Sequence, residues 1–413
     1  MRGARGRRLG AGVAAGLLLT ASLPARGWWP LGPAGVAVLF FALSGGGWRG
    51  RLAAGTVAGL ALYGPGLWWA TQFHAAGWAV LVLVEAAMFG LFVAAVPAGR
   101  GAVTVVALPA ALVVAEAVRG RWPFEGLPLA GLDLGQADGP LLPVARVGGH
   151  LAVVGVMAVA GVGLACLAGR RWRAAAGCLG LTVAAVVAGT VTPDGSDAGP
   201  LRVAAVQGGG VRGLRAVDAD PDAVFQAHLA ATRERVPPGS VALVVWPEDV
   251  VEVDGPLPGS QQDAEMARLA DELGATIVAG VVEEVPAAAR FRNAAVVWEP
   301  GRGVVDRYDK VHLVPFGEYV PFRSLVERVA DVSDVPRDAI AGTGPGVLDT
   351  AAGRLGVLIS YEVFFADRAQ AAVTAGGRLL LVPTNASSYT TSQVPAQELA
   401  VARLRAVETG RWV

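Results

Sequence analysis

The spacing of apolar stretches constrains the fold of this chain more than any other feature of its sequence. Seven such stretches fill most of the first half, at residues 9–23, 30–46, 52–70, 77–97, 102–118, 149–168 and 175–191. Each approaches the length of about 20 residues that a helix needs to cross a bilayer. We therefore predict an α-helical transmembrane bundle of about seven helices. The first stretch follows several arginines and could be a signal peptide, but further apolar stretches follow at once, which favours an anchor.

Composition divides the chain near residue 195. The chain is 54% apolar with a mean hydropathy of +0.50, which is too apolar for an ordinary soluble enzyme. Residues 1–200 contain 14 arginines and 7 acidic residues, so a net charge of zero hides a basic first half and an acidic second half. The sequence TVTPDGSDAGP around residue 195 has the composition of a linker. We predict a multi-pass transmembrane bundle at residues 1–195 and a soluble catalytic domain at residues 196–413.

The arginines of the short loops predict the orientation of the bundle. With the N-terminus inside, the inner side carries Arg2, Arg5, Arg7, Arg8, Arg49, Arg51, Arg100, Arg170, Arg171 and Arg173. The outer side carries Arg26, Arg119, Arg121 and Arg146. Ten arginines against four favour this orientation. An odd number of spans then places the second half of the chain on the outer face of the membrane.

Two acidic residues and one long loop stand out within the first half. Glu85 and Glu116 lie in apolar stretches, where an ionisable side chain is costly and is a candidate for a functional site. The alternative is a partner inside the bundle or a position near the membrane surface. The loop at residues 120–147 is apolar and aromatic but broken by proline and glycine. We predict that it is interfacial or re-entrant on the outer face.

The second half alternates between β-branched runs and helical patterns. The expected strands lie at 201–207, 241–246, 275–282, 355–360 and 379–383, with a hairpin at 293–309, and the expected helices lie near 221–235, 261–273, 365–376 and 394–408. Strands this apolar are buried on both faces. The pattern predicts an α/β domain whose sheets are covered by helices.

Polar residues of a catalytic type fall at the ends of these strands. Glu248 follows the run 241–246, Lys310 ends the hairpin, and Ser360, Tyr361 and Glu362 follow the strand that begins near 355. Strand ends of an α/β fold can converge on one crevice even when they are far apart in sequence. Glu318, eight residues beyond Lys310, can reach the same place. The two cysteines, Cys166 and Cys178, lack the spacing of metal ligands, so no zinc site or disulfide framework is implied.

Lys310 is the only lysine among 34 basic residues. One lysine can survive by chance, but an ammonium is a compact point charge whereas a guanidinium is a wide fork. A site that stabilises charge on a single oxygen requires the ammonium. A carboxylate, a lysine and a nucleophile are the set required for acyl transfer through a covalent intermediate.

Three segments carry a family resemblance: WPED at 246–249, YDKVHLVPFGEYVP at 308–321 and ISYE at 359–362. They resemble the catalytic segments of the nitrilase superfamily and, behind seven apolar stretches, the apolipoprotein N-acyltransferases of bacterial inner (cell) membranes. The resemblance implies a nitrilase-like α-β-β-α sandwich. It also implies transfer of an acyl chain from a phospholipid, through an acyl-enzyme, to the N-terminal diacylglyceryl-cysteine of a lipoprotein. No metal, dissociable cofactor or nucleic acid is implied.

The resemblance also implies a role for each matching residue. Glu248 is the general base, Lys310 stabilises the oxyanion, and Glu318 holds that lysine. Tyr361 and Glu362 flank the nucleophile. His312 is interpreted as a structural hydrogen-bonding residue rather than a base.

Three departures separate this chain from the family pattern. The family's nucleophile is a cysteine, but Ser360 stands here, and a hydroxyl is far harder to ionise than a thiol with its pKa of about 8.5. Native serine chemistry or altered acyl transfer, an engineered replacement that traps a complex, and loss of catalysis all remain open. Ala216 stands where family members carry tryptophan. The family continues beyond Val413 with further strands and a last span, so we expect this sequence to be a fragment.

Three functions follow from these observations. The first is the membrane-embedded N-acyltransferase. The second is a membrane-tethered amidase or nitrilase-type hydrolase, in which water replaces the amine as acceptor. The third is a catalytically silent binder of lipoproteins or lipids. A hydrolase of soluble amides needs only one anchor, so the seven apolar stretches favour the transferase.

Overall fold

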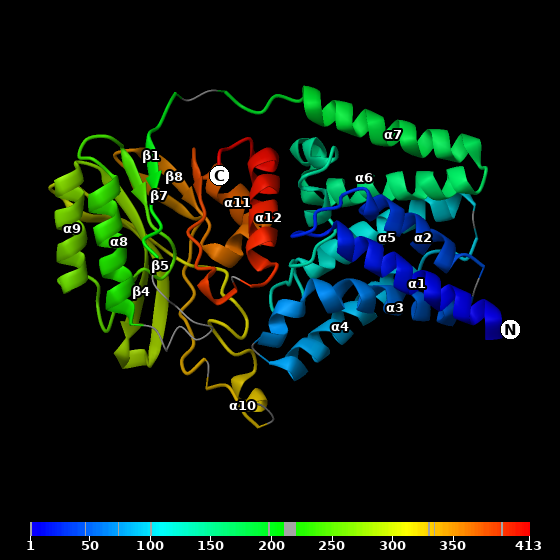
Figure 1. Cartoon of the computed structure of the whole chain (residues 1–413), viewed down its shortest axis with the longest axis horizontal. Helices are drawn as coiled ribbons and strands as arrows, with labels where there is room; N and C mark the ends of the chain where they lie inside the picture. The colour runs from blue at the N-terminus through cyan, green and yellow to red at the C-terminus, as the bar shows by residue number, and fades with distance from the viewer. Residues whose placement is uncertain are drawn as a thin grey trace. The chain divides into compact units, whose positions relative to one another are not determined.

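The computed structural model describes residues 2–45, 47–72, 74–99, 101–196, 199–209, 220–328, 331–333, 335–389 and 391–413. Two residues of the sequence predictions, Arg100 and Ala216, lie outside these ranges. The chain divides into two compact units, whose elements are labelled in Figure 1. The first unit contains Met1–Asp194 and Tyr389–Gly410, and the second contains Gly195–Ser388 and Arg411–Val413.

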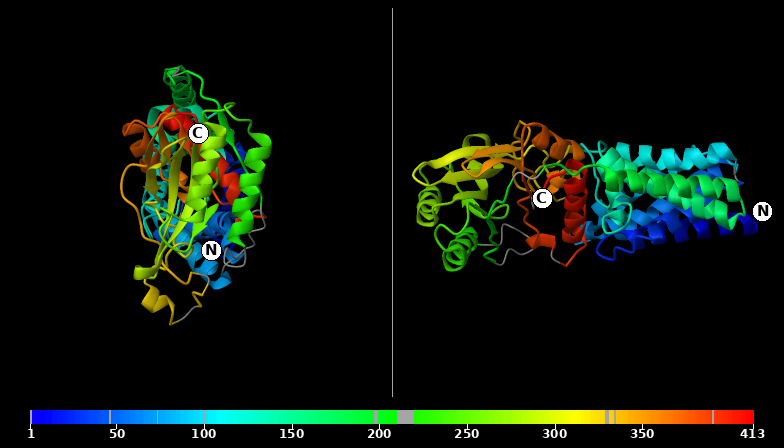
Figure 2. Two further views of the ribbon diagram at one scale, coloured as in Figure 1. Left: turned by 90° about the vertical axis from the view of Figure 1, so that its left-hand side faces the viewer. Right: turned by 90° about the horizontal axis from the view of Figure 1, so that it is seen from above.

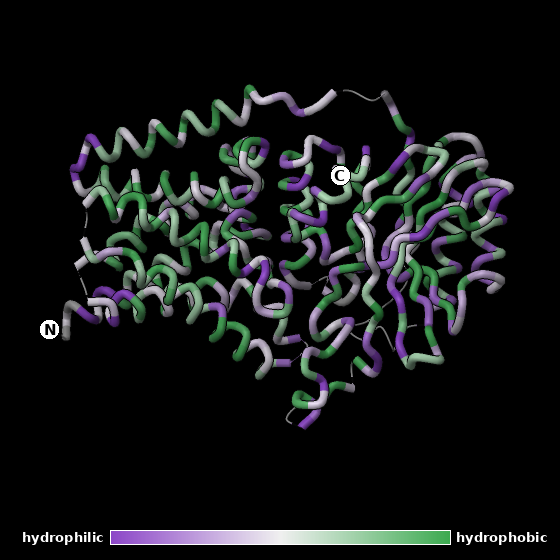
Figure 3. Tube along the Cα trace, turned by 180° about the vertical axis from the view of Figure 1, so that it is seen from behind, coloured by the Kyte–Doolittle hydropathy of each residue, from purple (hydrophilic) through white to green (hydrophobic). Residues whose placement is uncertain are grey.

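Each of the seven apolar stretches forms a helix of the first unit. They are α1 (Arg2–Ser22), α2 (Leu31–Leu43), α3 (Trp48–Gly66), α4 (Ala75–Ala94), α5 (Ala102–Arg119), α6 (Ala145–Ala168) and α7 (Trp172–Val191). In the part of the chain that the structure describes, four helical segments are long and apolar enough to cross a membrane, at Ala75–Ala94, Ala102–Arg119, Leu142–Ala168 and Trp172–Val191. Figure 3 shows how hydrophobic residues dominate these helices. The predicted transmembrane helical part is therefore confirmed, while the count of seven spans stays a prediction.

The loop between α5 and α6 packs within the first unit. It contains the short 3-10 helices η2 (Leu134–Gln136) and η3 (Leu142–Val144) and otherwise turns. Three of its leucines, Leu129, Leu132 and Leu134, are at most 3% exposed. The loop is thus held by protein contacts as well as by its own turns, and its interfacial or re-entrant position stays a prediction.

The strands of the second unit form two sheets. The larger sheet has the order β1-β2-β4-β5-β6, with β3 paired to β4, and the smaller has the order β7-β8-β9. The strands are β1 (Val203–Ala205), β2 (Leu243–Val245), β3 (Val251–Val253), β4 (Thr276–Val285), β5 (Arg290–Glu299), β6 (Gly303–Asp309), β7 (Val347–Thr350), β8 (Gly353–Val357) and β9 (Leu380–Leu381). The pairs β1–β2 and β2–β4 are parallel, whereas β4–β5 and β5–β6 are antiparallel.

Helices and sheets of the second unit form four layers. Helices α8 (Pro221–Arg235) and α9 (Gln261–Leu273) cover one face of the larger sheet, and their core includes Phe225, Leu269 and Trp298 (Figure 2). The opposite face packs on the smaller sheet through alternate residues of the same strands, such as Val278. Helix α11 (Ala366–Thr374) contacts β8 on the far side. This is the predicted α-β-β-α arrangement, with strands buried on both faces.

Helix α12 (Val394–Thr409) packs with the first unit although it follows the last strand of the second. The buried Gln397 accepts a hydrogen bond from the amide of Ala130 (2.8 Å) and donates one to the carbonyl of Gly66 (3.3 Å). Near the other end of the helix, Glu408 accepts a hydrogen bond from the amide of His150 (3.3 Å). The helix was predicted at 394–408, but this packing was not.

Candidate active site

The turn that carries Glu248 follows β2 directly and lies against β4. The amide of Gly280 donates to the carbonyl of Pro247 (3.0 Å). A Cβ at Gly280 would lie 2.5 Å from the Cα of Glu248, so only glycine on β4 admits the turn this closely. The following residue, Asp249, has a φ of +59°, which is unusual for a residue with a side chain. The local backbone therefore fixes where the buried Glu248 carboxylate points.

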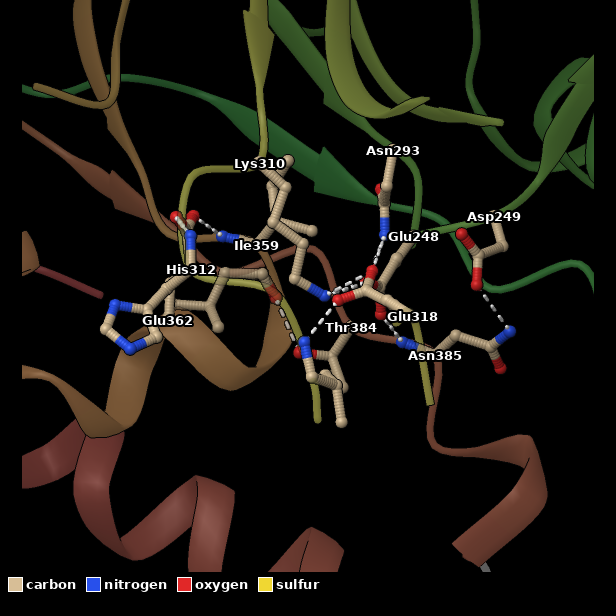
Figure 4. Close-up of polar contacts among 12 residues, drawn as sticks. Glu248, Asp249, Asn293, Lys310, His312, Glu318, Ile359, Glu362, Thr384 and Asn385 are labelled. Atoms are coloured by element: carbon tan, nitrogen blue, oxygen red, sulfur yellow. Dashed lines mark hydrogen bonds and ion pairs between the residues drawn. The ribbon is translucent and has the colours of Figure 1, made fainter. Parts of the chain in front are cut away.

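Lys310 lies between two carboxylates at the end of β6 (Figure 4). Its Nζ is 2.9 Å from Oε1 of Glu248 and 3.0 Å from Oε1 of Glu318. Asn293 of β5 donates from Nδ2 to the same two oxygens, at 2.8 Å each. The lysine is 1% exposed. The structure thus brings together three of the sequence-predicted residues, Glu248, Lys310 and Glu318.

The charge of Lys310 is stabilised by these neighbours. Burial by itself disfavours the ammonium, but the negative charges of Glu248 and Glu318 and their hydrogen bonds outweigh it, so the pKa of Lys310 is raised well above its ordinary value. An ammonium has three N–H donors. The described residues supply acceptors for two of them, which leaves one donor for a further oxygen.

Glu318 is held by the loop that follows Lys310. Its Oε2 accepts a hydrogen bond from the amide of Val314 (2.7 Å), and the loop is closed by the amide of Phe316, which donates to the carbonyl of Tyr319 (2.7 Å). Phe316 has a φ of +60°, so this loop is strained as well as tight. One oxygen of Glu318 therefore binds the lysine and asparagine while the other fixes its own loop.

Ser360 begins a short 3-10 helix, η6 (Ser360–Phe364), immediately beyond β8. Its φ is +49°, a left-handed conformation that a side-chain-bearing residue adopts only when its surroundings impose it. Its amide donates to the carbonyl of Pro383 (2.9 Å). Two residues after Pro383, the amide of Asn385 donates to Oε2 of Glu248 (3.0 Å). The segment 383–385 thus joins the backbone of Ser360 to the carboxylate of Glu248.

Glu362 and several aromatic residues lie next to the turn of Ser360. The completely buried Glu362 accepts hydrogen bonds from the amides of Ile359, Val311 and His312. The ring of His312 stacks on Phe365 with centroids 3.6 Å apart, while its expected role as a structural hydrogen-bonding residue stays a prediction. Tyr361 is also buried and meets Phe365 edge to face, at 5.0 Å.

Sequence reasoning assigned no role to several residues of this site. Asn293 is one polar residue at the start of the apolar run NAAVVW, and a lone asparagine in a strand carries no local signal. Asn385 was noticed after its strand, but only the fold shows that its amide binds Glu248. Tyr308 and Arg368 contact Glu362, with Tyr308 donating to its Oε1 at 2.8 Å.

A second buried ion cluster occupies the first unit. Arg119 donates from Nε to Glu85 (2.7 Å) and from Nη1 to Glu116 (3.0 Å). Its Nη2 donates to the carbonyls of Leu127 (2.8 Å) and Leu129 (2.6 Å). The two glutamates that the sequence offered as functional candidates therefore have a partner inside the bundle, the alternative interpretation given for them.

Comparison with known proteins agrees with this architecture. Residues 202–413 match the family model of carbon-nitrogen hydrolases, and residues 15–163 match that of the apolipoprotein N-acyltransferase N-terminal domain. Among solved structures, Nit3 of Saccharomyces cerevisiae, a member of branch 10 of the nitrilase superfamily, matches with a TM-score of 0.33 and 21% identity, over 45% of this chain and 64% of that one. By the family model, residues 202–413 are a carbon-nitrogen hydrolase domain, in a chain that also carries transmembrane helices.

Curated relatives narrow this class to one family. The chain is 33% identical over 457 aligned residues to the apolipoprotein N-acyltransferase of Mycolicibacterium smegmatis, covering 98% of this chain and 74% of the relative. It is 32% identical over 437 residues to that of Pseudomonas syringae pv. tomato, covering 97% and 83%. The chain belongs to the apolipoprotein N-acyltransferase family of the nitrilase superfamily, as the sequence motifs predicted.

Proposed function

We propose that this protein is an N-acyltransferase that moves an acyl chain from a phospholipid to the N-terminal diacylglyceryl-cysteine of lipoproteins. Family membership and the names of the relatives support the reaction class. The observation that carries the proposal is the buried Lys310, paired with Glu248 and Glu318, together with the segment 383–385 that joins Glu248 to the strained turn of Ser360. A lysine held in this way keeps a donor for the oxygen of a reacting ester.

The first half-reaction forms an acyl-enzyme. Glu248 accepts the hydroxyl proton of Ser360 while the Ser360 oxygen attacks the ester carbonyl carbon of the phospholipid. The negative charge that develops on the carbonyl oxygen is stabilised by the remaining N–H of Lys310. The tetrahedral intermediate then expels the alkoxide of the lysophospholipid, which takes the proton from Glu248. An ester to Ser360 remains.

The second half-reaction transfers the acyl chain to the amine. The neutral α-amino group of the acceptor attacks the acyl-serine carbonyl and gives a proton to Glu248. Lys310 stabilises the second oxyanion in the same way as the first. Collapse of this intermediate forms the amide and breaks the ester, and the Ser360 oxygen recovers the proton from Glu248. The amine is the nucleophile that accepts the acyl chain, the role that water has in a hydrolase.

The three explanations for Ser360 make different predictions in one assay. Purified protein is incubated with a phospholipid labelled in its acyl chain and with a diacylated lipopeptide, and the adduct and the product are measured by mass spectrometry. We expect a triacylated lipopeptide and an acyl adduct on Ser360. Ser360→Ala abolishes both, Ser360→Cys retains or raises turnover, and the exposed Ser333→Ala serves as the matched control. Turnover that survives in Ser360→Ala would refute the proposed nucleophile.

The same assay separates the transferase from its alternatives. A membrane-tethered amidase or nitrilase-type hydrolase would release free fatty acid at an equal rate with and without the lipopeptide. A silent binder would give neither product nor adduct, and Ser360→Cys would then test whether the thiol restores chemistry to this site. Four helical segments able to cross a membrane favour the transferase, because a hydrolase of soluble amides needs only one anchor.

We also infer the placement of the two predicted domains, residues 1–195 as a multi-pass bundle of about seven helices and residues 196–413 as the catalytic domain. The family and the apolar helices make the chain a bacterial membrane protein. The distribution of arginines supports an inner membrane location with the catalytic domain on the outer face. Exposed tryptophans near the helix ends support a bundle with two interfaces. Trp28, Trp68 and Trp122 would lie on one side, and Trp48 and Trp172, the first residues of α3 and α7, on the other. Fusions of alkaline phosphatase after residue 195 are expected to be active, and inactive fusions would contradict this orientation.

A further inference from the structure

One carboxylate joins the two segments that carry Lys310 and Ser360. Oε1 of Glu362 accepts the amides of Val311 (3.0 Å) and His312 (3.1 Å), the two residues that follow Lys310. Oε2 of Glu362 accepts the amide of Ile359 (2.9 Å), the residue before Ser360. The position of this single planar group therefore sets the spacing between the lysine and the serine turn.

The fold gives these two segments little other backbone connection. Lys310 follows β6, the edge strand of the larger sheet, whereas Ser360 follows β8 in the smaller sheet. Among the described strands, no hydrogen-bonded ladder joins β6 to β8. Sheets that pack only through side chains can shift against each other more easily than paired strands. The buried Glu362 carboxylate binds backbone amides of both segments at the point where the two strands end, and so resists such a shift.

Two further side chains hold Glu362 itself. Tyr308, on β6 two residues before Lys310, donates its hydroxyl to Oε1 of Glu362 at 2.8 Å. Nη2 of Arg368 donates to that hydroxyl (2.7 Å) and to the carbonyl of Gly344 (2.9 Å), and Nε of Arg368 lies 3.7 Å from Glu362. The guanidinium binds the lone pair of the tyrosine oxygen, so the tyrosine proton is directed at the carboxylate.

The contacts persist over the working pH range. Burial, and next the negative charge of Glu362, raise the pKa of Tyr308 above its ordinary value. The hydroxyl therefore stays protonated and remains a donor. Glu362, the acceptor of that hydroxyl, also accepts hydrogen bonds from three backbone amides.

The place of Arg368 in its helix is unfavourable by itself. It lies in the first turn of α11, which begins at Ala366, where the helix dipole favours acidic and disfavours basic side chains. Helix stability therefore does not explain an arginine at this position. The contacts with Tyr308, Gly344 and Glu362 do, since a guanidinium can serve several acceptors at fixed angles.

We propose that Tyr308 and Arg368 are positioning residues of the active site, which fix the Glu362 carboxylate and through it the distance between the Lys310 ammonium and the Ser360 side chain. Neither residue contacts the reacting atoms. Their removal loosens the alignment of the serine turn with the lysine and leaves the surfaces that bind substrate in place. The effect is therefore on the rate of the chemical step rather than on substrate affinity.

The first test reads the environment of residue 360 without any turnover. In a Ser360→Cys background, alkylation of residue 360 by iodoacetamide is followed against pH by mass spectrometry of its peptide. A thiolate there is stabilised by the nearby ammonium, so its midpoint reports their alignment. We expect Tyr308→Phe and Arg368→Gln each to raise the midpoint by at least about half a pH unit. Arg354→Gln, which removes an exposed arginine paired with Asp349 in the same unit, is expected to leave the profile unchanged. Superimposable profiles for all four proteins would overturn the proposal.

The second test uses turnover and rests on the proposed function. We expect Tyr308→Phe and Arg368→Gln to lower kcat about 10- to 100-fold, as small misplacements of reacting groups do, with KM within about twofold of the parent. Arg368→Lys keeps a donor and is expected to fall between Arg368→Gln and the parent. Since both residues act through Glu362, the double variant should lose little more than the worse single variant.

The two tests distinguish a failure of the positioning proposal from a failure of the proposed function. A parent protein without transferase activity would contradict the proposed function, while the alkylation profiles still decide the positioning role. Additive losses in the double variant, or losses in KM rather than kcat, would contradict the positioning role while the parent remains active. Thermal unfolding midpoints of all variants are measured alongside. A loss of rate that parallels the loss of thermal stability across the variants, Arg368→Lys included, would count against the positioning role.

Discussion

Two buried clusters of this protein have the same charges and different surroundings. Lys310 of the second unit and Arg119 of the first each lie between two glutamates and are 1% exposed or less. Arg119 uses four of its five N–H donors on Glu85, Glu116 and two backbone carbonyls of the loop after α5. Lys310 uses two of three on carboxylates. The guanidinium of Arg119 binds loop carbonyls as well as carboxylates and so anchors the loop, whereas both bonds of the Lys310 ammonium to described residues go to carboxylates.

The two clusters also differ in what else satisfies the acids. Asn293 shares both oxygens with Lys310, and Glu248 receives a further amide from Asn385, so the two carboxylates proposed to serve catalysis are oriented from several sides. In the first unit the ring of Tyr63 lies over the Arg119 guanidinium at 4.6 Å, which adds a cation–π contact. Burial alone thus fails to tell a functional ion cluster from a structural one, whereas the partners of the cation, loop carbonyls for Arg119 and carboxylates for Lys310, differ between them.

Replacing Lys310, the proposed catalytic cation, is expected to have the largest effect on transferase turnover. Lys310→Arg places a wide fork in a closed site that suits a point charge, so the donor aimed at the oxyanion is misplaced. We expect transferase turnover to fall by about 10³-fold, the upper range for loss of an oxyanion donor, with little change in the thermal unfolding midpoint. Full activity in Lys310→Arg would remove the distinction between the two clusters.

Removing the second acid of the catalytic cluster is expected to have the next largest effect. Glu318→Gln leaves Glu248 and Asn293 in place but lets the lysine shift, and a displacement of about 1 Å can lower a rate by about 10²-fold. The change should appear in kcat at unchanged KM. Glu327→Gln, on the exposed side of the same loop region, is the matched control and should retain the parent rate.

The reciprocal exchange in the first unit should affect stability instead. Arg119→Lys keeps the charge but has too few donors, so carbonyls of Leu127 and Leu129 lose their partners. Leaving buried polar groups unpaired costs about 1–3 kcal/mol. We expect a lower thermal midpoint in detergent, with the alkylation profile of a cysteine at position 360 unchanged. A profile that shifts with Arg119→Lys would show that this cluster also serves the chemistry.

The pH dependence of stability should separate the buried lysine from an accessible ion pair. The pKa of Lys310 is raised, so its contribution is complete below the unfolded-state pKa of about 10.4 and is lost only as pH rises through the folded-state value above it. Asp338 is the opposite case, because hydrogen bonds from Arg323 lower its pKa. Its contribution is present above about pH 3.9 and is lost as pH falls through the lower folded-state pKa.

Replacing Asp338, the acid of the accessible ion pair, should have the smallest effect of this series of variants. Asp338→Asn is expected to lower stability by less than about 1 kcal/mol at pH 7, as for other accessible pairs. The difference from the parent should shrink as the pH approaches the folded-state pKa of Asp338. A thermal midpoint of Asp338→Asn that differs from the parent by the same amount at every pH would contradict the ionic origin of the contribution.

Local chemistry explains where sequence prediction succeeded. Helices α8 and α9 begin and end where expected, because Asp220 and Ser260 cap their first turns and Gly274 ends α9 in a left-handed conformation. Such signals depend on residues within one turn of each other. Strands β3 and β7 were not expected, since three or four residues carry too little pattern to stand out.

The candidate site divides in the same way. Glu248, Lys310 and Glu318 could be proposed together because each follows an expected strand or its loop within a recognisable motif. Ser360 was placed at a strand end, but its left-handed backbone could not be foreseen in a residue that is not glycine. Asn293 and Arg368 gave no signal, because their partners are distant in sequence and are brought near only by strand pairing and helix packing.

The sequence alone determined the composition of the two halves, the helical stretches, the order of most strands and the residue types available for acyl transfer. Those properties arise from hydrophobic periodicity and from neighbours along the chain. Only the tertiary structure decided which acids share a cation, that Arg119 anchors a loop while the Lys310 ammonium binds two carboxylates, and that α12 packs with the first unit. These outcomes depend on contacts between segments many residues apart, where the fit of donors to acceptors and of side chains to space is settled by the packed fold.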